Sequence, residues 1–429
     1  MYYFLIANAI SLIGNNLTII AIPWFVLETT GSPAKMGLVG LFTVLPAVIA
    51  AFFGGTIVDR AGHKRMSILA DISSGVTVAL IPLLYSTVGL AFWQLLLLVF
   101  FSALLDAPGN TARLALLPDV AESSGFSLER ANAAQQLIHR ASFLVGPIIA
   151  GALITIVGTT NVLWLDALSF GVSATLFAVA VPGGKAAPVA ETGYLQELRD
   201  GLRFIRADRL ILTLVITVAI TNFLDTPLFA VVLPVFAKQF LGNAAQLGLM
   251  ISVFGAGAVL GTLLYGAFAH RFSRRWTFVT AFLLVSIPFW IVSLAPPLPI
   301  VLAALFCSGV AAGPLNPVIM TVTQSRVPAE MRGRVFGMMS ALAFMAAPLG
   351  MVVTGYCTER LGVSTTLAGI AFFYLLVTAI QAFNPTLRDM DDCEPLAVGQ
   401  PAVATSTGIG DSPENSDLHI HVVSEAHGN

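Results

Sequence analysis

The sequence is poor in charged residues. Only 10% of its 429 residues are Asp, Glu, Lys or Arg, whereas 57% are hydrophobic. A soluble domain carries about 25% charged residues, so this chain lacks the polar cover that a water-exposed surface needs. Neither sign of charge dominates, because 21 basic residues stand against 23 acidic ones. The composition therefore excludes a soluble enzyme, a nucleic-acid-binding protein and a disordered chain.

The sequence also lacks the motifs of metal, redox and nucleotide chemistry. Its three cysteines form no Cys-x-x-Cys pair: Cys307, Cys357 and Cys393. It has no Gly-x-x-x-x-Gly-Lys-Ser/Thr loop, so ATP is not expected to drive the protein directly. The histidines near its end, at 419, 421 and 427, are scattered in a polar segment and do not indicate a metal site. We expect no cofactor, no bound metal and no enzymatic activity.

Long apolar runs are what the sequence has in abundance. A bilayer core of about 30 Å needs about 20 helical residues, and a backbone in lipid must satisfy its own hydrogen bonds. Twelve runs are long enough, and they predict an all-α membrane protein with twelve transmembrane helices. The predicted spans are 2–27, 34–58, 66–86, 90–112, 131–158, 161–182, 210–236, 245–269, 276–295, 299–322, 335–357 and 362–383.

The distribution of basic residues predicts the orientation of these spans. With both termini in the cytoplasm, only Lys35, Lys238 and Arg360 of the 21 basic residues face outward. Loops rich in Lys and Arg stay on the cytoplasmic side of a membrane. The sequence therefore predicts a multi-pass protein with both termini cytoplasmic.

One long connection divides the twelve spans into six and six. The predicted parts are an N-terminal bundle at 1–182, a linker at 183–209, a C-terminal bundle at 210–384 and a disordered tail at 385–429. The linker carries apolar residues at helical spacing: Leu195, Leu198, Leu202 and Ile205. This pattern indicates an amphipathic helix on the inner membrane surface or an ordinary solvated linker helix.

The two halves share a series of short patterns in the same order. The loop after the second span, 55–65, matches the loop after the eighth, 266–275. Pro108-Gly-Asn110 likewise matches Pro314-Leu-Asn316. Such internal order predicts two pseudo-symmetric six-helix bundles related by duplication.

Two motifs make the chain resemble a known family. The loop pattern Gly-x-x-x-Asp-Arg-x-Gly-x-Lys-Arg, in a chain of twelve spans, resembles the major facilitator superfamily over residues 1–384. The segment 146–151 resembles the Gly-Pro-x-x-Gly-Gly motif of its antiporter branches, with Ala150 in place of a glycine. The matching positions there are Gly146, Pro147 and Gly151.

A closer resemblance lies in the stretches 22–27, 31–33, 127–132 and 332–337. They are similar to Tap-like multidrug efflux proteins of actinobacteria and, more loosely, to macrolide exporters. This resemblance implies the major facilitator fold, a bacterial inner membrane and proton-driven export of antibiotics. Such relatives commonly carry an Asp in the first helix where this chain has Asn15, and an amide cannot carry a proton.

The loop pattern also has a physical interpretation. A carboxylate at the inner end of the second span can accept hydrogen bonds from a helix N-terminus or pair with nearby cations. It would form a latch that holds one conformation, with Asp71 as a supporting residue. The alternative is that the basic residues only keep this loop on the cytoplasmic side. The residues of this candidate latch are Gly55, Asp59, Arg60, Gly62, Lys64, Arg65 and Asp71.

Acidic residues inside a span are costly and are therefore candidates for function. Asp225 lies near the middle of the seventh span, beside Asn222 and Pro227. Asp225 is a candidate for proton coupling and, together with Asn222, for substrate binding, and the alternative is a silent hydrogen bond between helices. The corresponding depth of the first span holds Asn15 and Asn16, which are candidates for substrate binding.

A second candidate for proton coupling is Asp106 in the fourth span. Arg140 in the fifth span lies at a similar depth, which predicts an Asp106–Arg140 ion pair with His139 nearby. Arg140 is alternatively a binding residue for an anionic group of a substrate. Asp166 is expected to be a carboxylate at a helix end or an outer gate. Trp24 is a candidate for the lining of a drug pocket.

The sequence therefore predicts a secondary transporter that exports amphipathic drugs by alternating access, with protons as the coupling ion. Its partners would be a small-molecule substrate, protons and the lipid bilayer, with no nucleic acid, and the fold's default state is a monomer. Two alternatives remain open: an importer or facilitator of a specific solute, and a membrane sensor or scaffold that transports nothing.

Overall fold

The computed structural model describes residues 1–181 and 194–392, except for the side chains of residues 51–61, 180, 194, 195 and 197. This part of the chain is helical throughout and holds no strand. Twelve of its helical spans are long and apolar enough to cross a membrane. The predicted fold class is confirmed.

The N-terminal bundle consists of seven helices in six spans, because the fourth span is divided in two. They are α1 (Tyr2–Thr30), α2 (Pro33–Ala61), α3 (His63–Thr87), α4 (Phe92–Leu104), α5 (Asp106–Ser123), α6 (Leu128–Val157) and α7 (Thr159–Ala180).

The second half begins with the linker helix α8 (Tyr194–Ala207) and continues with six spans. Their helices are α9 (Arg209–Pro227), η1 (Leu228–Val232), α10 (Leu233–Phe236), η2 (Ala237–Leu241), α11 (Ala244–Phe268), η3 (Ala269–Arg271), α12 (Arg274–Ser293), α13 (Leu298–Ala312), α14 (Leu315–Arg326), η4 (Ala329–Met331), α15 (Arg332–Met345), α16 (Ala347–Leu361), α17 (Val363–Phe383) and η5 (Pro385–Met390).

Prolines mark the interruptions of several spans. The break before α5 lies beside Pro108, and the break before α14 lies at Pro314, its counterpart in the other half. The seventh span changes from α-helix to π-helix directly after Pro227. Proline removes a backbone donor and bends a helix, so these segments can turn side chains toward the interior of a bundle.

The fourth span extends further than the sequence predicted. It was expected to end at residue 112, but α4 and α5 together form one membrane span from Phe92 to Ser123. Arg113 therefore lies inside a bundle and is only 4% exposed, instead of lying in an inner loop. Since a buried guanidinium needs partners, this difference changes the interpretation of the site.

The linker contains the predicted helix, α8, and the apolar face of this helix lies against the protein. The apolar face of α8 packs against α15, where Ile205 is buried with Val335 and Met338, and Leu202 packs against this cluster. Gly201 lies against the backbone of Arg334. The amphipathic pattern of α8 thus serves contact with the C-terminal bundle.

The predicted tail begins with an ordered segment. Residues 385–390 form η5, and Leu387 and Met390 are fully buried. Asp391 accepts a hydrogen bond from Ser273 Oγ at the start of α12, at 2.6 Å. The rest of the predicted tail, 393–429, lies outside the described residues.

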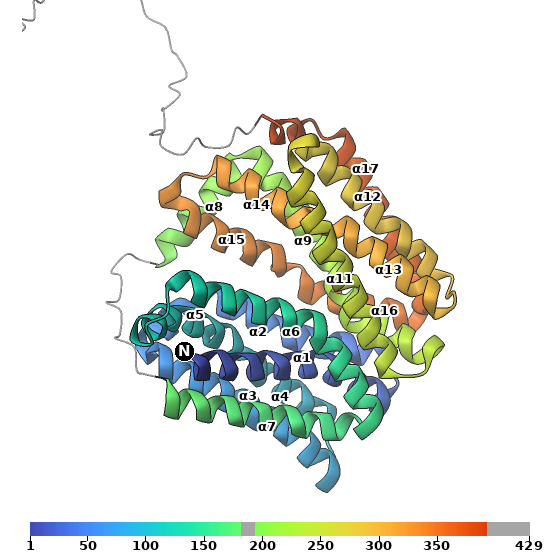
Figure 1. Ribbon diagram of the computed structural model, residues 1–429. Helices are drawn as coiled ribbons and strands as arrows, with labels where there is room; N and C mark the ends of the chain where they lie inside the picture. The colour runs from blue at the N-terminus through green and yellow to red at the C-terminus, as the bar shows by residue number, and fades with distance from the viewer. Residues whose placement is uncertain (182–193, 393–429) are drawn as a thin grey trace, which may run out of the picture. The chain divides into compact units, whose positions relative to one another are not determined.

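The most extensive contacts between the two bundles are made by two pairs of helices, α6 with α11 and α2 with α16 (Figure 1). The largest buried apolar cluster contains residues of both bundles, among them Met36 and Met351. Two smaller clusters do not cross between the bundles: one lies around Phe177 in the N-terminal bundle, and one around Val335 in the C-terminal bundle with α8.

Candidate functional site

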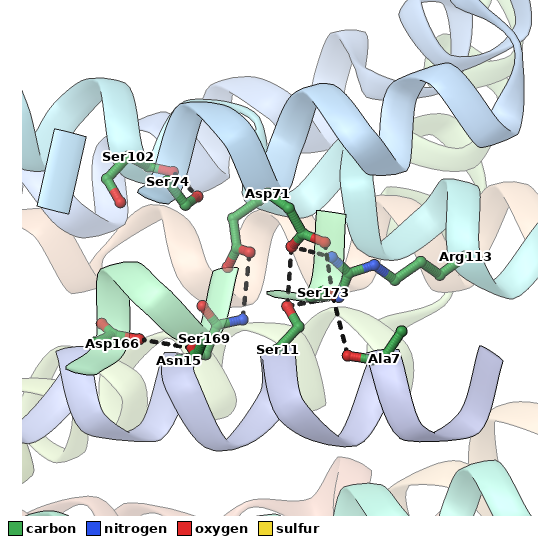
Figure 2. Close-up of polar contacts among 11 residues, drawn as sticks. Ala7, Ser11, Asn15, Asp71, Ser74, Ser102, Arg113, Asp166, Ser169 and Ser173 are labelled. Carbon is green, nitrogen blue, oxygen red and sulfur yellow. Dashed lines mark hydrogen bonds and ion pairs between the residues drawn. The ribbon is translucent and has the colours of Figure 1, made fainter. Parts of the chain in front are cut away.

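A buried ion pair lies at the centre of the N-terminal bundle. Arg113 of α5 pairs with Asp71 of α3, and the two residues are 4% and 1% exposed (Figure 2). Ser11 of α1 accepts from Arg113 Nη1 at 2.9 Å and donates to Asp71 Oδ1 at 3.0 Å. Ser173 of α7 donates to Asp71 Oδ2 at 2.7 Å. Four helices therefore supply the hydrogen bonds that a buried ion pair requires.

The position of Asp71 corrects one prediction. We expected it to support the loop around Asp59, but its carboxylate is occupied by Arg113, Ser11 and Ser173. Arg113 was missed by the sequence analysis because it was assigned to a loop. Its place seven residues after Asp106, within a helix that extends to Ser123, is the signal that would have found it.

Helix α1 supplies a hydrogen-bond donor to each of three carboxylates in the N-terminal bundle, of which Asp71 and Asp166 are buried. Ser11 donates to Asp71, Asn15 Nδ2 donates to Asp106 Oδ1 at 3.4 Å, and Thr18 Oγ1 donates to Asp166. The donors are four and three residues apart, so they share one face of α1. This polar stripe (Ser11, Asn15 and Thr18) orders three acidic residues along the bundle, and the sequence analysis had recognised only Asn15.

Asp166 is placed differently from the prediction. It is fully buried on α7, where it also accepts a hydrogen bond from Ser169 Oγ at 3.4 Å. A carboxylate at a helix end, as predicted, would be exposed to water. The hydrogen bond from Thr18 of α1 makes Asp166 part of the contact between α1 and α7.

The predicted Asp106–Arg140 ion pair is wrong: no salt bridge joins these two residues in the part of the chain that the structure describes. Asp106 is bound to Asn15 instead. Arg140 lines a cavity of about 300 Å³ between α6 and α11. The other residues of this cavity are Gln136, His139, Phe143, Leu144, Gly255 and Val259. Arg140 thus lies at a cavity that is lined by one helix of each bundle.

In the C-terminal bundle, the carboxyl group of Asp225 is hydrogen-bonded to a tyrosine. Tyr374 of α17, 2% exposed, donates its hydroxyl to Asp225 Oδ1. One turn before Asp225, Asn222 Nδ2 donates to the carbonyl oxygen of Ala343 on α15, at 3.0 Å. Asp225 and Asn222 therefore contact different neighbours of α9, just before its π-helical segment.

The remaining substrate-binding candidates are packed. Asn16 donates to the Leu12 carbonyl of its own helix at 2.7 Å and lies against Gly146 of α6. Trp24 is only 4% exposed, and its Nε1 donates to Glu28 Oε1 at 2.8 Å. The hydrogen-bond partners of both residues thus lie within the N-terminal bundle.

The candidate latch is only partly described. Gly62 has a φ of +81°, which favours glycine at this turn. Lys64 Nζ donates to the Ala178 carbonyl of α7 at 2.9 Å, and the Arg65 side chain is exposed. The side chains of Asp59 and Arg60 and the surroundings of Gly55 lie outside the described residues.

The antiporter-type motif lies where α6 meets α11. A Cβ on Gly151 would collide with the Ala244 carbonyl of α11, and one on Gly248 of α11 would collide with the Pro147 carbonyl. The two backbones can approach this closely because glycines face them from both sides. This backbone contact joins the N-terminal bundle to the C-terminal bundle.

Twelve spans in two bundles, with broken helices and charges buried at membrane depth, define a membrane transporter of the major facilitator type. The crystal structure of the nucleoside transporter NupG has this fold: its TM-score is 0.75 at 13% identity, covering 89% of this chain and 98% of that one.

The model of the family described as "Transmembrane secretion effector" matches residues 2–407, and the chain belongs to this family. It is 32% identical over 402 residues to the multidrug efflux pump Tap of Mycobacterium tuberculosis (strain ATCC 25618 / H37Rv), covering 91% of this chain and 94% of the relative. It is 22% identical over 361 residues to macrolide efflux protein A of Streptococcus pyogenes, covering 83% and 89%.

Proposed function

We propose that this transporter exports amphipathic drugs from the cytoplasm by alternating access and that proton entry drives the export. The observation that carries the proposal is a carboxyl group in each bundle, bound to one neutral donor: Asp106 with Asn15, and Asp225 with Tyr374. Neither has a salt bridge among the described residues, so each can bind or release a proton without breaking one. The multidrug and macrolide exporters similar to this chain support the direction and the substrate class.

Asp106 takes the place of a carboxyl group in the first helix. The Tap-like proteins that this chain resembles commonly carry an Asp at the position of Asn15. Because Asn15 and Asp106 are hydrogen-bonded, the carboxyl group in this chain lies beside that position, on α5. A proton site can therefore be kept in the N-terminal bundle although α1 holds an amide.

Arg140 is the proposed contact for acidic groups of a substrate. It lines the cavity between α6 and α11 together with His139, and Phe143 and Val259 supply apolar surface. Charge beside apolar walls suits an amphipathic molecule. The protein would work as a monomer in the bacterial inner membrane, with both termini in the cytoplasm, because basic residues gather on that side.

The conformational change would separate α6 from α11 on the outer side and engage the 55–65 loop on the inner side. The glycine-lined contact at Gly151 and Gly248 supports the first step, since two packed backbones form a discrete closed arrangement. Asp59 and its neighbouring cations would act in the second step.

The experiment is a measurement of drug accumulation in cells that express the wild type, Asp225→Asn or the control Asp119→Asn, with and without a protonophore. Asp119 is an exposed residue of α5, so its substitution removes a carboxylate without touching the bundle interior. We expect the wild type and the control to lower accumulation, the protonophore to abolish this effect, and Asp225→Asn to be inactive at equal expression.

Other outcomes identify the alternatives. Increased accumulation of a solute in wild-type cells would indicate an importer and contradict export. Unchanged accumulation across a broad panel of drugs would remove the multidrug assignment. Full activity of Asp225→Asn would leave Asp106 as the proton site.

A further inference from the structure

The short turn between α1 and α2 is held from both sides by the other bundle. Lys238 of η2 donates from Nζ to the Leu27 carbonyl in the last turn of α1, at 2.7 Å. Glu359 of α16 accepts from the backbone N–H of Ala34 in the first turn of α2, at 3.0 Å, and from Ser32 Oγ. Both charged residues belong to the C-terminal bundle, and both helix ends belong to the N-terminal bundle.

The signs of these charges match the helix ends that they touch. A helix C-terminus carries partial negative charge and favours a cation, whereas a helix N-terminus carries partial positive charge and favours an anion. α1 and α2 have 29 residues each, so both dipoles are fully developed at the turn. Lys238 and Glu359 each lie at the end that attracts them.

The packing below the turn depends on the same approach of the bundles. Met351 lies against Gly40, and Gly355 lies against the Pro33 carbonyl and Gly37. Met351 is only 2% exposed. If the outer ends of the bundles separate, both charge contacts are lost and Met351 becomes accessible from outside.

We propose that Lys238 and Glu359 form an outer clamp that holds the transporter closed to the outside by binding the two helix ends of the α1–α2 turn. The inference rests on alternating access, but it concerns the outer gate and no substrate or proton site. Lys238 and Glu359 are positioning residues: they act through the ends of α1 and α2 on the balance between closed and open outer ends.

The folded bundle does not need the clamp for its hydrogen bonds. The Leu27 carbonyl also accepts from the N–H of Gly31, at 3.1 Å, and Lys35 N–H is bound to Ser32 Oγ at 3.2 Å. Glu359 is exposed, so its contribution to overall stability is small. Loss of either charge is therefore expected to change the conformational balance without unfolding the protein.

The test uses the full-length protein with its three cysteines replaced by serine and Met351→Cys as a reporter. Labelling by a membrane-impermeant maleimide, added outside intact cells, measures the opening of the outer ends. Lys238→Met removes a charge with little change in shape, and Glu359→Gln keeps an acceptor oxygen for Ala34. We expect each to raise the labelling rate about two- to fivefold, and Lys238→Arg to restore the rate of the reporter protein.

Two polar residues of the other outer turns serve as controls. Asn161 donates to the Val157 carbonyl at 2.8 Å, and Gln94 accepts from the N–H of Ala91 at 2.9 Å, both within the N-terminal bundle. Asn161→Ala and Gln94→Ala should leave the labelling rate unchanged.

The dependence of the labelling rate on ionic strength distinguishes an electrostatic clamp from a contact held by packing alone. Raising the ionic strength should accelerate labelling of the reporter protein, since exposed charges are screened, and the Lys238→Met/Glu359→Gln pair should lose this dependence. Equal labelling in clamp and control variants at equal expression would overturn the proposal. Because labelling needs no drug, this result is independent of the export assay.

Discussion

Asn15 of α1 donates a hydrogen bond from its side-chain amide to Asp106 Oδ1 of α5, across 3.4 Å. The two residues are 91 positions apart in the chain. This contact puts the proposed proton site of the N-terminal bundle between two helices, and exchanging its two residues would move the carboxyl group from α5 to α1.

The exchange is a direct test of the site. Asp106→Asn should lower drug efflux by about tenfold or more, because no group that exchanges protons remains in the pair. The double variant Asn15→Asp/Asp106→Asn should recover part of the efflux, since it restores one carboxyl group and one amide at the same contact. Efflux is measured at equal expression, with Asp119→Asn as the control. Efflux by Asp106→Asn at the wild-type rate would contradict the assignment.

Tyr374 is predicted to tune the proton site of the C-terminal bundle. Tyr374→Phe removes the hydroxyl that donates to Asp225 while retaining the aromatic ring. A hydrogen bond to a charged group contributes about 1.5–3 kcal/mol, so we expect efflux to fall by about tenfold or more but to remain sensitive to a protonophore. Tyr356→Phe, at an exposed tyrosine of α16, is the matched control. Loss of protonophore sensitivity in Tyr374→Phe would show that Asp225 alone does not couple transport to protons.

The Asp71–Arg113 pair is predicted to stabilise the bundle. Asp71→Asn or Arg113→Met leaves the other residue of the pair charged and buried without its counter-ion. This should lower the free energy of unfolding by about 3–5 kcal/mol. The double variant Asp71→Leu/Arg113→Met leaves no unpaired charge and should be more stable than either single variant. Thermal unfolding in detergent measures this order. A double variant that is less stable than both single variants would contradict it.

The contact between α6 and α11 gives a prediction from backbone geometry. Gly248→Ala adds a Cβ where the Pro147 carbonyl already lies, so the two helices must move apart. We expect reduced efflux together with faster external labelling of Met351→Cys. Gly171→Ala is the control, since a Cβ there meets nothing within 4 Å. Unchanged efflux and labelling in Gly248→Ala would mean that the contact tolerates separation.

Hydropathy predicted the number of spans because each helix in lipid must be long and apolar by itself. The depth of Asp225 could be predicted in the same way, because it depends only on the place of the residue within one helix. The partners of the charges were harder to predict. The sequence paired Asp106 with Arg140 by depth alone, but depth gives no information on the direction in which a side chain leaves its helix.

The partner of Asp225 was missed for a related reason. Tyr374 lies 149 residues further along the chain, and the sequence contains no pattern that joins the two. Lys238 was assigned to the outer side by the charge rule and Glu359 was not singled out, and nothing local connected either residue with the turn between α1 and α2. Such contacts depend on the rotation of each helix about its own axis.

The sequence by itself determined the class of the protein, because burial in lipid acts on each helix separately and leaves its mark in composition and length. It also predicted a duplication of the two halves, since the order of motifs is a property of the chain. Only the tertiary structure decided that Arg113 neutralises Asp71, that Asn15 accompanies Asp106 and that Lys238 and Glu359 hold one turn. These relationships arise from the packing of helices that are distant in the chain, where side-chain direction decides which groups meet.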